Sequence, residues 1–264
     1  MEELTKDVVK EVAKDAYEDM GRPIAKPTGE LVGLVPRAIK AALAPLEKWI
    51  LAREFNVAET RKLLEEKLKD IPPENITSPE PYVAVPALQY ISYCMDNHEL
   101  RNMYASLLAA SMNERAKNGV HPSFVEVIKQ LSPDEAKILS YMTKCKALPT
   151  ISVRFENEKG EGIPFINDFS NVDEIVGCER KHETGKYFDN LERLGLIKRA
   201  PSYSVLTTES RYQPLIEDEF IKSAEAAKEI VSHIIENPKF KIVKSFVSIS
   251  DYGRAFCIVC LPNE

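Results

Sequence analysis

The chain has 264 residues, of which 44% are hydrophobic and 29% are charged, and its formal net charge is −6. Such a composition is typical of a soluble globular protein with a sizeable core, and the length allows one large or two ordinary domains. Residues 1–131 carry 17 Lys and Arg against 20 Asp and Glu, while residues 132–264 carry 18 against 21. Neither half therefore has the basic excess that is typical of a dedicated nucleic-acid-binding protein.

The cysteines are few for this length and are scattered along the chain: Cys94, Cys145, Cys178, Cys257 and Cys260. This usage favours a reducing compartment over a disulfide framework. The first twenty residues, "MEELTKDVVKEVAKDAYEDM", mix charges of both signs and contain no apolar core of a secretory signal. We therefore expect a cytoplasmic protein.

Residues 1–131 have apolar side chains at helical spacing, with short joints between the segments, which predicts a helical bundle. The most hydrophobic window is residues 31–55, and within it, at residues 34–51, apolar and cationic side chains fall on opposite faces of a helix. One interpretation is a helix that faces the core of the bundle. The other is a helix on a membrane surface, with contacts from Arg37, Leu43, Leu46 and Lys48.

The stretch "NGVHPSFVEVIKQLSPDEAKIL", residues 118–139, contains two helix starts in succession. Pro122 suits a first helical position because its missing N–H would be unpaired there anyway. Ser132 precedes a second proline, and Glu135 follows at the spacing of a capping box. His121 has no carboxylate or cysteine at a spacing that would assist catalysis, so we expect it to cap or hinge a helix.

Beyond residue 148 the pattern changes to strands at 149–155 and 239–250, with helices between and after them. The order of helices, and "LERLGLIKR" leading into a strand, resemble a winged helix. We therefore predict a mainly α protein with two domains. A helical bundle covers residues 1–131, and an α+β winged-helix-like domain with an inserted long helix covers residues 132–264.

Winged helices serve as DNA-binding modules and as protein-docking modules, so both functions stay open. The helix expected at residues 183–195 is mixed in charge, whereas a helix that enters the major groove beside phosphates is normally neutral to basic. If the domain binds DNA, the contacts are expected from the cationic residues in and around this helix, which are Lys181, His182, Lys186, Arg193, Lys198 and Arg199.

The inserted helix, expected at residues 214–236, has a wide apolar stripe. A helix of that length either covers the sheet of its own domain or pairs with a second subunit. We expect a self-association interface here, formed by Phe220, Ala227, Ile230 and Ile234.

Sequence signatures of enzymes are missing: there is no P-loop, G-x-G-x-x-G, G-x-S-x-G or H-E-x-x-H. "CIVC" at residues 257–260 has metal-binding spacing but no second pair of ligands, and Cys178 with His182 also falls short of four. Asp168, Asp173 and Glu174 could form an acidic metal site, but such spacing is common in loops. We predict no catalytic residue, no metal site, no cofactor and no small-molecule substrate.

The chain as a whole resembles the abortive infection alpha family of bacterial proteins. The resemblance rests on "YEDMGRPIAKPTGE", "ALAPLEKW", "IPPENI", "ELRNMYASLLAASMN", "VHPSFVEVIKQLSPDEAKIL", "YFDNLERLGLI" and "SISDYGRAF". It implies a role in phage defence, in which an infected cell stops growing or dies before progeny emerge. The family supplies no catalytic residues that could be carried over.

These expectations combine into a non-enzymatic sensor or effector of phage defence that acts through a protein partner or a second copy of itself. Two alternatives stay open. One is a DNA-binding regulator that uses the helix at residues 183–195. The other is a membrane-acting effector that uses residues 34–51.

Overall fold

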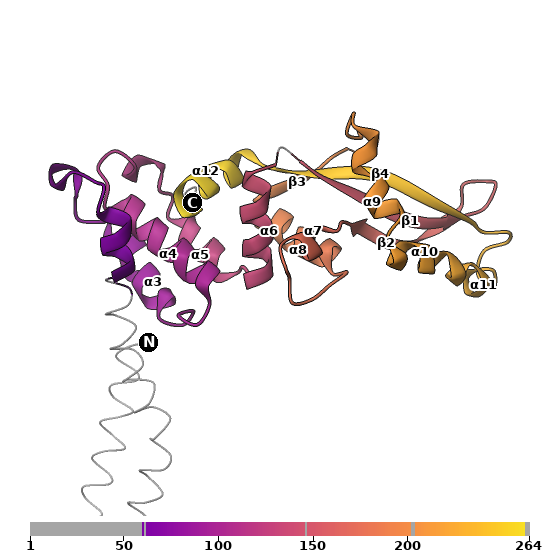
Figure 1. Ribbon diagram of the computed structural model, residues 1–264, viewed down its shortest axis with the longest axis horizontal. Helices are drawn as coiled ribbons and strands as arrows, with labels where there is room; N and C mark the ends of the chain where they lie inside the picture. Colours follow the sequence, from indigo (N-terminus) through magenta and orange to yellow (C-terminus); the bar gives the residue numbers. More distant parts are fainter. Residues whose placement is uncertain (1–59, 61, 146, 202–203, 262–264) are drawn as a thin grey trace, which may run out of the picture. The chain divides into compact units, whose positions relative to one another are not determined.

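The computed structural model describes residues 60, 62–145, 147–201 and 204–261 (Figure 1). All of these belong to one compact unit, Glu54–Glu264. A helix at residues 62–68 is followed by the main helices of the first part of the chain, which are α3 (Pro81–Ile91), α4 (His98–Ser111), α5 (Ser123–Lys129) and α6 (Pro133–Thr143). Two short 3-10 turns, η1 (Pro73–Asn75) and η2 (Lys117–Gly119), lie between them.

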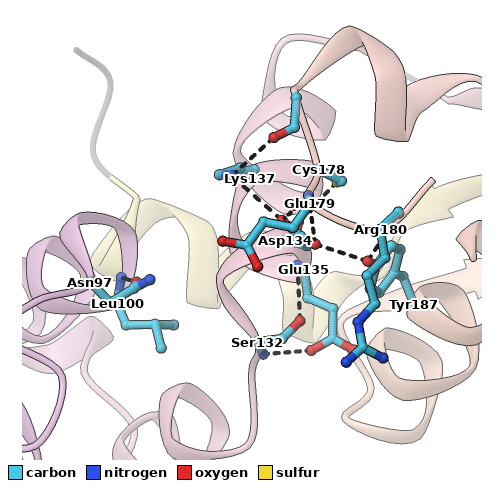
Figure 2. A network of polar contacts seen from close by, with 11 residues as sticks. Asn97, Leu100, Ser132, Asp134, Glu135, Lys137, Cys178, Glu179, Arg180 and Tyr187 are labelled. Atoms are coloured by element: carbon cyan, nitrogen blue, oxygen red, sulfur yellow. Dashed lines mark hydrogen bonds and ion pairs between the residues drawn. The ribbon is translucent and has the colours of Figure 1, made fainter.

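Side-chain caps start two of these helices. Asn97 caps α4, because its Oδ1 accepts a hydrogen bond of 2.9 Å from the Leu100 N–H. The capping box predicted at the start of α6 is confirmed: the Glu135 N–H donates to Ser132 Oγ at 3.2 Å, and the Ser132 N–H donates to Glu135 Oε2 at 2.7 Å (Figure 2). Both caps satisfy backbone donors that the first turn of a helix leaves unpaired.

The strands form one antiparallel sheet in the order β2-β1-β4-β3. They are β1 (Leu148–Glu156), β2 (Gly162–Phe169), β3 (Ile197–Arg199) and β4 (Lys239–Ile249). β1 pairs with β4 over its whole length, from Leu148 opposite Val247 to Glu156 opposite Lys239. Since β1 and β4 occupy the centre of the sheet, this pairing joins segments that lie far apart in the sequence.

One face of the sheet is covered by the chain that connects β3 to β4. Because side chains alternate along a strand, Ile151 and Val153 point to the same face. There they pack with Tyr212, Leu215 and Ile221 in a small apolar core. The covering elements are η3 (Glu209–Arg211), α9 (Gln213–Ile216), α10 (Glu219–Ala224), η4 (Glu225–Ala227) and α11 (Lys228–Val231) (Figure 1).

The larger core joins the helices to the end of the sheet where β1 begins and β4 ends. It contains buried side chains from α3 to α6, from α8 (Thr184–Arg193), from the ends of β1, β3 and β4, and from α12 (Asp251–Cys260). α7 (Val172–Ile175) contributes Val172. Phe124 and Phe256 meet edge to face with their ring centroids 5.3 Å apart, a favoured aromatic geometry. This core therefore includes side chains from both sides of residue 131, where the sequence analysis placed the end of the helical bundle.

Several local predictions are confirmed. β1 and β4 lie where the alternating segments predicted strands, and α8 ends at Gly195, whose φ of +74° suits a residue without Cβ. The sequence did not predict β2. Residues 204–208, between β3 and η3, are irregular.

The predicted fold class is wrong. Instead of a small wing, the strands form one four-stranded antiparallel sheet, in which the β1–β2 hairpin precedes α8 and β3 pairs with the distant β4. The inserted long helix is replaced by short pieces, because Asp218 Oδ1 accepts the Phe220 N–H and starts a new helix. Helices α3 to α5 share a core with α6, α8 and α12, so they do not form a separate bundle. Residues 1–59, assigned to that bundle, lie outside the described residues.

The start of α12 tolerates only glycine at residue 253. A Cβ added there would lie 1.9 Å from the carbonyl oxygen of Leu196. We expect Gly253→Ala to lower the free energy of unfolding by about 1–3 kcal/mol, because the helix must move away from residue 196. Urea denaturation would measure the change. Gly119→Ala is the control, since its added Cβ meets only Val259 at an ordinary 3.8 Å. Equal midpoints for the two variants would contradict this packing.

Candidate functional site

The most connected buried polar side chain of the described residues is Asp134 on α6. Its carboxylate accepts a hydrogen bond of 2.9 Å from the Tyr187 hydroxyl on α8 and bonds of 3.1 and 3.2 Å from the Glu179 N–H (Figure 2). Lys137 Nζ lies 3.5 Å from the same carboxylate and donates to the Gly177 carbonyl at 3.1 Å. We call Asp134, Lys137, Glu179 and Tyr187 the Asp134 junction.

The local sequence places this carboxylate. Ser132 caps α6, so Asp134 lies in the first turn, where the helix dipole favours a negative charge. Gly177 has a φ of +66°, which lets the chain after α7 turn back toward α6. α8 then brings Tyr187 to the carboxylate from 53 residues away. The junction therefore fixes α6, the segment 177–180 and α8 relative to one another.

The hydrogen bonds of the junction keep Asp134 ionised. Burial acts to raise the pKa of Asp134, but the hydrogen bonds from Tyr187 and from the N–H groups of Glu179 and Arg180 outweigh it and lower the pKa. Burial also raises the pKa of Tyr187, so its hydroxyl stays a donor. These groups hold one another in fixed protonation states, which suits a structural junction better than proton transfer.

Three of the cysteines, Cys178, Cys257 and Cys260, are buried thiols. Burial raises the pKa of Cys178 to about 12 and that of Cys257 to about 12, and it raises the pKa of Cys260 as well. Because the thiolate is the nucleophile and the metal ligand, these side chains are poorly reactive at neutral pH. Within the described ranges, no group of three or more His, Cys, Asp or Glu side chains is arranged to hold a metal ion.

The acidic residues considered for a metal site have separate partners. Asp168 accepts a hydrogen bond of 2.8 Å from Arg199 Nε. Asp173 is buried and accepts one of 2.6 Å from the His182 N–H. Glu174 forms an ion pair of 3.2 Å with Lys181. The structure thus does not bring these three carboxylates to a common point.

The lysines and arginines proposed for DNA contact are engaged with acidic or polar groups. Arg199 is the most constrained, since it donates to the carboxylates of Asp168, Asp189 and Glu192. The three carboxylates carry more negative charge than the single positive charge of Arg199. An arginine in this setting must lose several ion pairs before it can bind a phosphate.

The other candidates follow the same pattern. Lys186 pairs with Glu183 at 3.1 Å, and Lys198 Nζ lies 3.8 Å from Asp251. Arg193 donates to the side chains of Asn190 and Gln130. The His182 ring stacks on Phe220, with the ring centroids 4.4 Å apart and the planes at 10°.

The residues proposed for self-association separate into two groups. Phe220 lies at the edge of the small core, against the rings of His182 and Phe169, and is partly buried. Ile230 and Ile234 are each 70% exposed, although both carry large apolar side chains. Ala227 ends η4 and is partly exposed. Only the end of the predicted stripe therefore reaches the surface.

The residues proposed for membrane contact, Arg37, Leu43, Leu46 and Lys48, lie outside the described residues. Among the helices that the structure describes, none combines the length and the apolarity needed to cross a bilayer. The cytoplasmic location stays a prediction.

His121 has the capping role that the sequence predicted. Its Nδ1 accepts a hydrogen bond of 3.2 Å from the Ser123 N–H in the first turn of α5. The Ser123 hydroxyl lies 2.5 Å from His121 Nδ1 and 2.5 Å from the Tyr252 hydroxyl on α12. The His121 ring also contacts the rings of Phe124 and Tyr252. The histidine thus helps attach α12 to α5.

Comparison with known proteins identifies the family. The family model described as abortive infection alpha matches residues 52–260. The chain belongs to the abortive infection alpha family. The resemblance seen in the sequence motifs is therefore confirmed. No curated protein matches the chain.

A solved structure, that of an uncharacterized protein from the hydrocarbon-degrading marine bacterium Alcanivorax borkumensis SK2, is similar to part of the chain. Its sequence identity is 20% and its TM-score is 0.37, with 52% of this chain and 90% of that chain covered. A similarity this low does not support an argument about function.

The Asp134 junction makes stability depend on acidic pH. Asp134→Asn removes a charged acceptor of several hydrogen bonds, so we expect a loss of about 1–3 kcal/mol in the free energy of unfolding at pH 7. The pKa of Asp134 is lowered in the folded state, so the stabilisation is present above the unfolded pKa of about 4 and disappears as the pH falls through the folded pKa. The difference between the variant and the wild type should therefore shrink below about pH 4.

Urea denaturation at a series of pH values measures this dependence. Asp70→Asn is the matched control because Asp70 is an exposed carboxylate away from the junction. The wild type and Asp134→Asn could instead differ in the free energy of unfolding by the same amount from neutral to acidic pH. That result would show that the carboxylate charge is unimportant.

Proposed function

We propose that this member of the abortive infection alpha family acts in phage defence as a sensor or effector that works through protein contacts, without a reaction of its own. Family membership indicates the role in abortive infection. The observation that supports action by contact is the exposure of Ile230 and Ile234 beside the covered face of the sheet.

Ile230 lies in α11, and Ile234 lies in the turn that follows this helix. Ile234 also lines a cleft of about 470 Å³ together with Ile163 and Ile235. The rest of the lining is mostly polar or charged, and comprises Asn157, Glu158, Lys159, Glu161, Gly162, Glu236 and Asn237. The apolar surface is therefore small and lies beside a polar cleft. Exposed apolar side chains that lie close together are unfavourable in water and can mark a site of protein contact.

A second copy of the chain is the partner that we propose for this surface. In a twofold dimer the same patch lies on both subunits, so an apolar patch meets an apolar patch without charges to match. A small apolar patch gives weak association that depends on concentration. Such association allows a chain to be separate before infection and assembled after it.

The rival role of a DNA-binding regulator has less support. Its candidate cations, Lys181, Lys186, Lys198 and Arg199, are all within ion-pair distance of carboxylates. Mobility-shift assays at low salt separate the two roles, because phosphate contacts give an affinity that falls steeply as salt increases. Such binding would favour the regulator.

Introducing negative charge at Ile230 and Ile234 tests the proposed self-association surface. We expect the double variant Ile230→Glu and Ile234→Glu to stay monomeric at concentrations where the wild-type chain associates, since four carboxylates would meet across a twofold interface. Sedimentation velocity across a concentration series measures the change. Circular dichroism verifies the fold.

Ile258→Glu is the matched control, because Ile258 is 77% exposed on α12 and distant in sequence from this surface. In cells challenged with phage, the wild type and the control should reduce plaque formation, while the double variant should not. Full protection by a double variant that is folded and monomeric would reject this role for the surface.

A further inference from the structure

The face of the sheet opposite the small apolar core carries an arginine without a partner. Side chains alternate along β1, so Ile151 and Val153 point into the small core, whereas Arg154 points to the opposite face. Its Nε is buried and has no hydrogen-bond partner, and no carboxylate of the described residues forms an ion pair with it. We propose that this face binds an acidic segment of a partner protein, through a carboxylate that reaches the Arg154 guanidinium.

The position of Arg154 is unfavourable in the free protein. A buried donor that lacks an acceptor has given up its hydrogen bond to water without replacing it. Lys241 lies directly opposite Arg154 on β4, so the two cationic side chains point to the same face. Like charges in opposite positions repel one another. A carboxylate supplied from outside relieves both the unpaired donor and the repulsion.

The neighbouring cations on this face already have acidic partners. Lys241 forms an ion pair with Glu156, and Lys239 Nζ lies 3.2 Å from Glu158 Oε1. These three cations and two carboxylates leave Arg154 as the uncompensated charge. A planar guanidinium binds a single carboxylate through two parallel hydrogen bonds. The charge of this face therefore fits one carboxylate at Arg154.

The surroundings of Arg154 favour a protein segment over a nucleic acid. Pro164 lies opposite Arg154 on β2 and is exposed, and Val243 on β4 points to the same face and is partly exposed. Both offer apolar contacts to the side chains beside a bound carboxylate. A nucleic-acid strand carries a phosphate on every nucleotide, so it would meet Glu156 and Glu158 as well as the single free cation.

The proposal extends the proposed action through protein contacts, but it rests on other residues than the self-association surface. Ile230 and Ile234 lie in and just after α11, whereas Arg154 lies on the face of the sheet opposite the small core. A monomeric double variant at the two isoleucines should therefore still bind an acidic segment. The two proposals can fail separately.

Fluorescence anisotropy of the full chain tests the proposal with three labelled probes. These are an octapeptide in which Asp and Val alternate, the same peptide with Asn in place of Asp, and a thymidine octanucleotide. We expect saturable binding of the acidic peptide that weakens as salt increases, and weaker binding of the other two probes. Absence of binding by the acidic peptide at low salt overturns the proposal. Tighter binding of the octanucleotide also overturns it, since the face would then bind nucleic acid.

Replacement of the arginine localises the binding. We expect Arg154→Met to lower the affinity for the acidic peptide by about tenfold, because the charged hydrogen bonds are lost. The same variant should raise the thermal midpoint of the free protein by about 2–4 °C, because the unpaired donor and the repulsion from Lys241 disappear. A lower midpoint would show that Arg154 stabilises the fold, and it would overturn the proposal.

Thr150→Val is the matched control. Thr150 lies on the same face of β1, is 0% exposed, and has an Oγ1 without a hydrogen-bond partner. Its replacement should also raise the midpoint but leave the affinity unchanged, because no ligand reaches a fully buried hydroxyl. Lys222→Gln, at an exposed lysine on α10, is the control for general charge. A loss of affinity in either control equal to that in Arg154→Met would overturn the site.

Discussion

The antiparallel pairing of β1 with β4 is the contact on which the rest of the structure depends. It joins residues 148–156 to residues 239–247, so the whole chain between them becomes a closed loop. Closing a loop of that length costs entropy, which the ladder and the two apolar cores must offset. Once β4 is in place, α12 follows directly and packs against α4 and α5, as the contact between Phe124 and Phe256 shows. The larger core therefore forms from both ends of the described chain.

The Asp134 junction holds α6 against α8 and the segment 177–180. Burial of a carboxylate is costly unless hydrogen bonds replace its water, and here the Tyr187 hydroxyl and the Glu179 N–H do so. An apolar contact would permit small shifts of α8 against α6, whereas directed hydrogen bonds define one arrangement. α8 in turn carries Asp189 and Glu192 to Arg199, so the same helix compensates the charge of β3.

Surfaces of three kinds remain available among the described residues. One is apolar and lies at Ile230 and Ile234, where the covering segment runs past the edge of the small core. Another is a cleft lined by residues of α4, α6 and α12, among them the exposed Lys144. The third is the face of the sheet at Arg154, opposite the small core. The paired cations around α8 are less suited to binding a partner, because the partner must first displace their carboxylates.

The sequence by itself determined the local elements and the family. The cap at Ser132, the end of α8 at Gly195 and the alternation in β1 and β4 all depend on neighbours within a few residues, so the pattern was sufficient. The motifs also identified the abortive infection alpha family, which the match over residues 52–260 confirms.

Only the tertiary structure decided the fold class, the sheet order and the sites. β2 is partly exposed and irregular in its pairing with β1, so its sequence has no clear alternation. The apolar stripe at residues 214–236 suggested one helix, but packing buries Leu215 and leaves Ile230 exposed. Asp134 was only one acidic residue among many until Tyr187 reached it from another helix. Pairings between distant segments have no local sequence signal, because their energy exists only after the chain has brought them together.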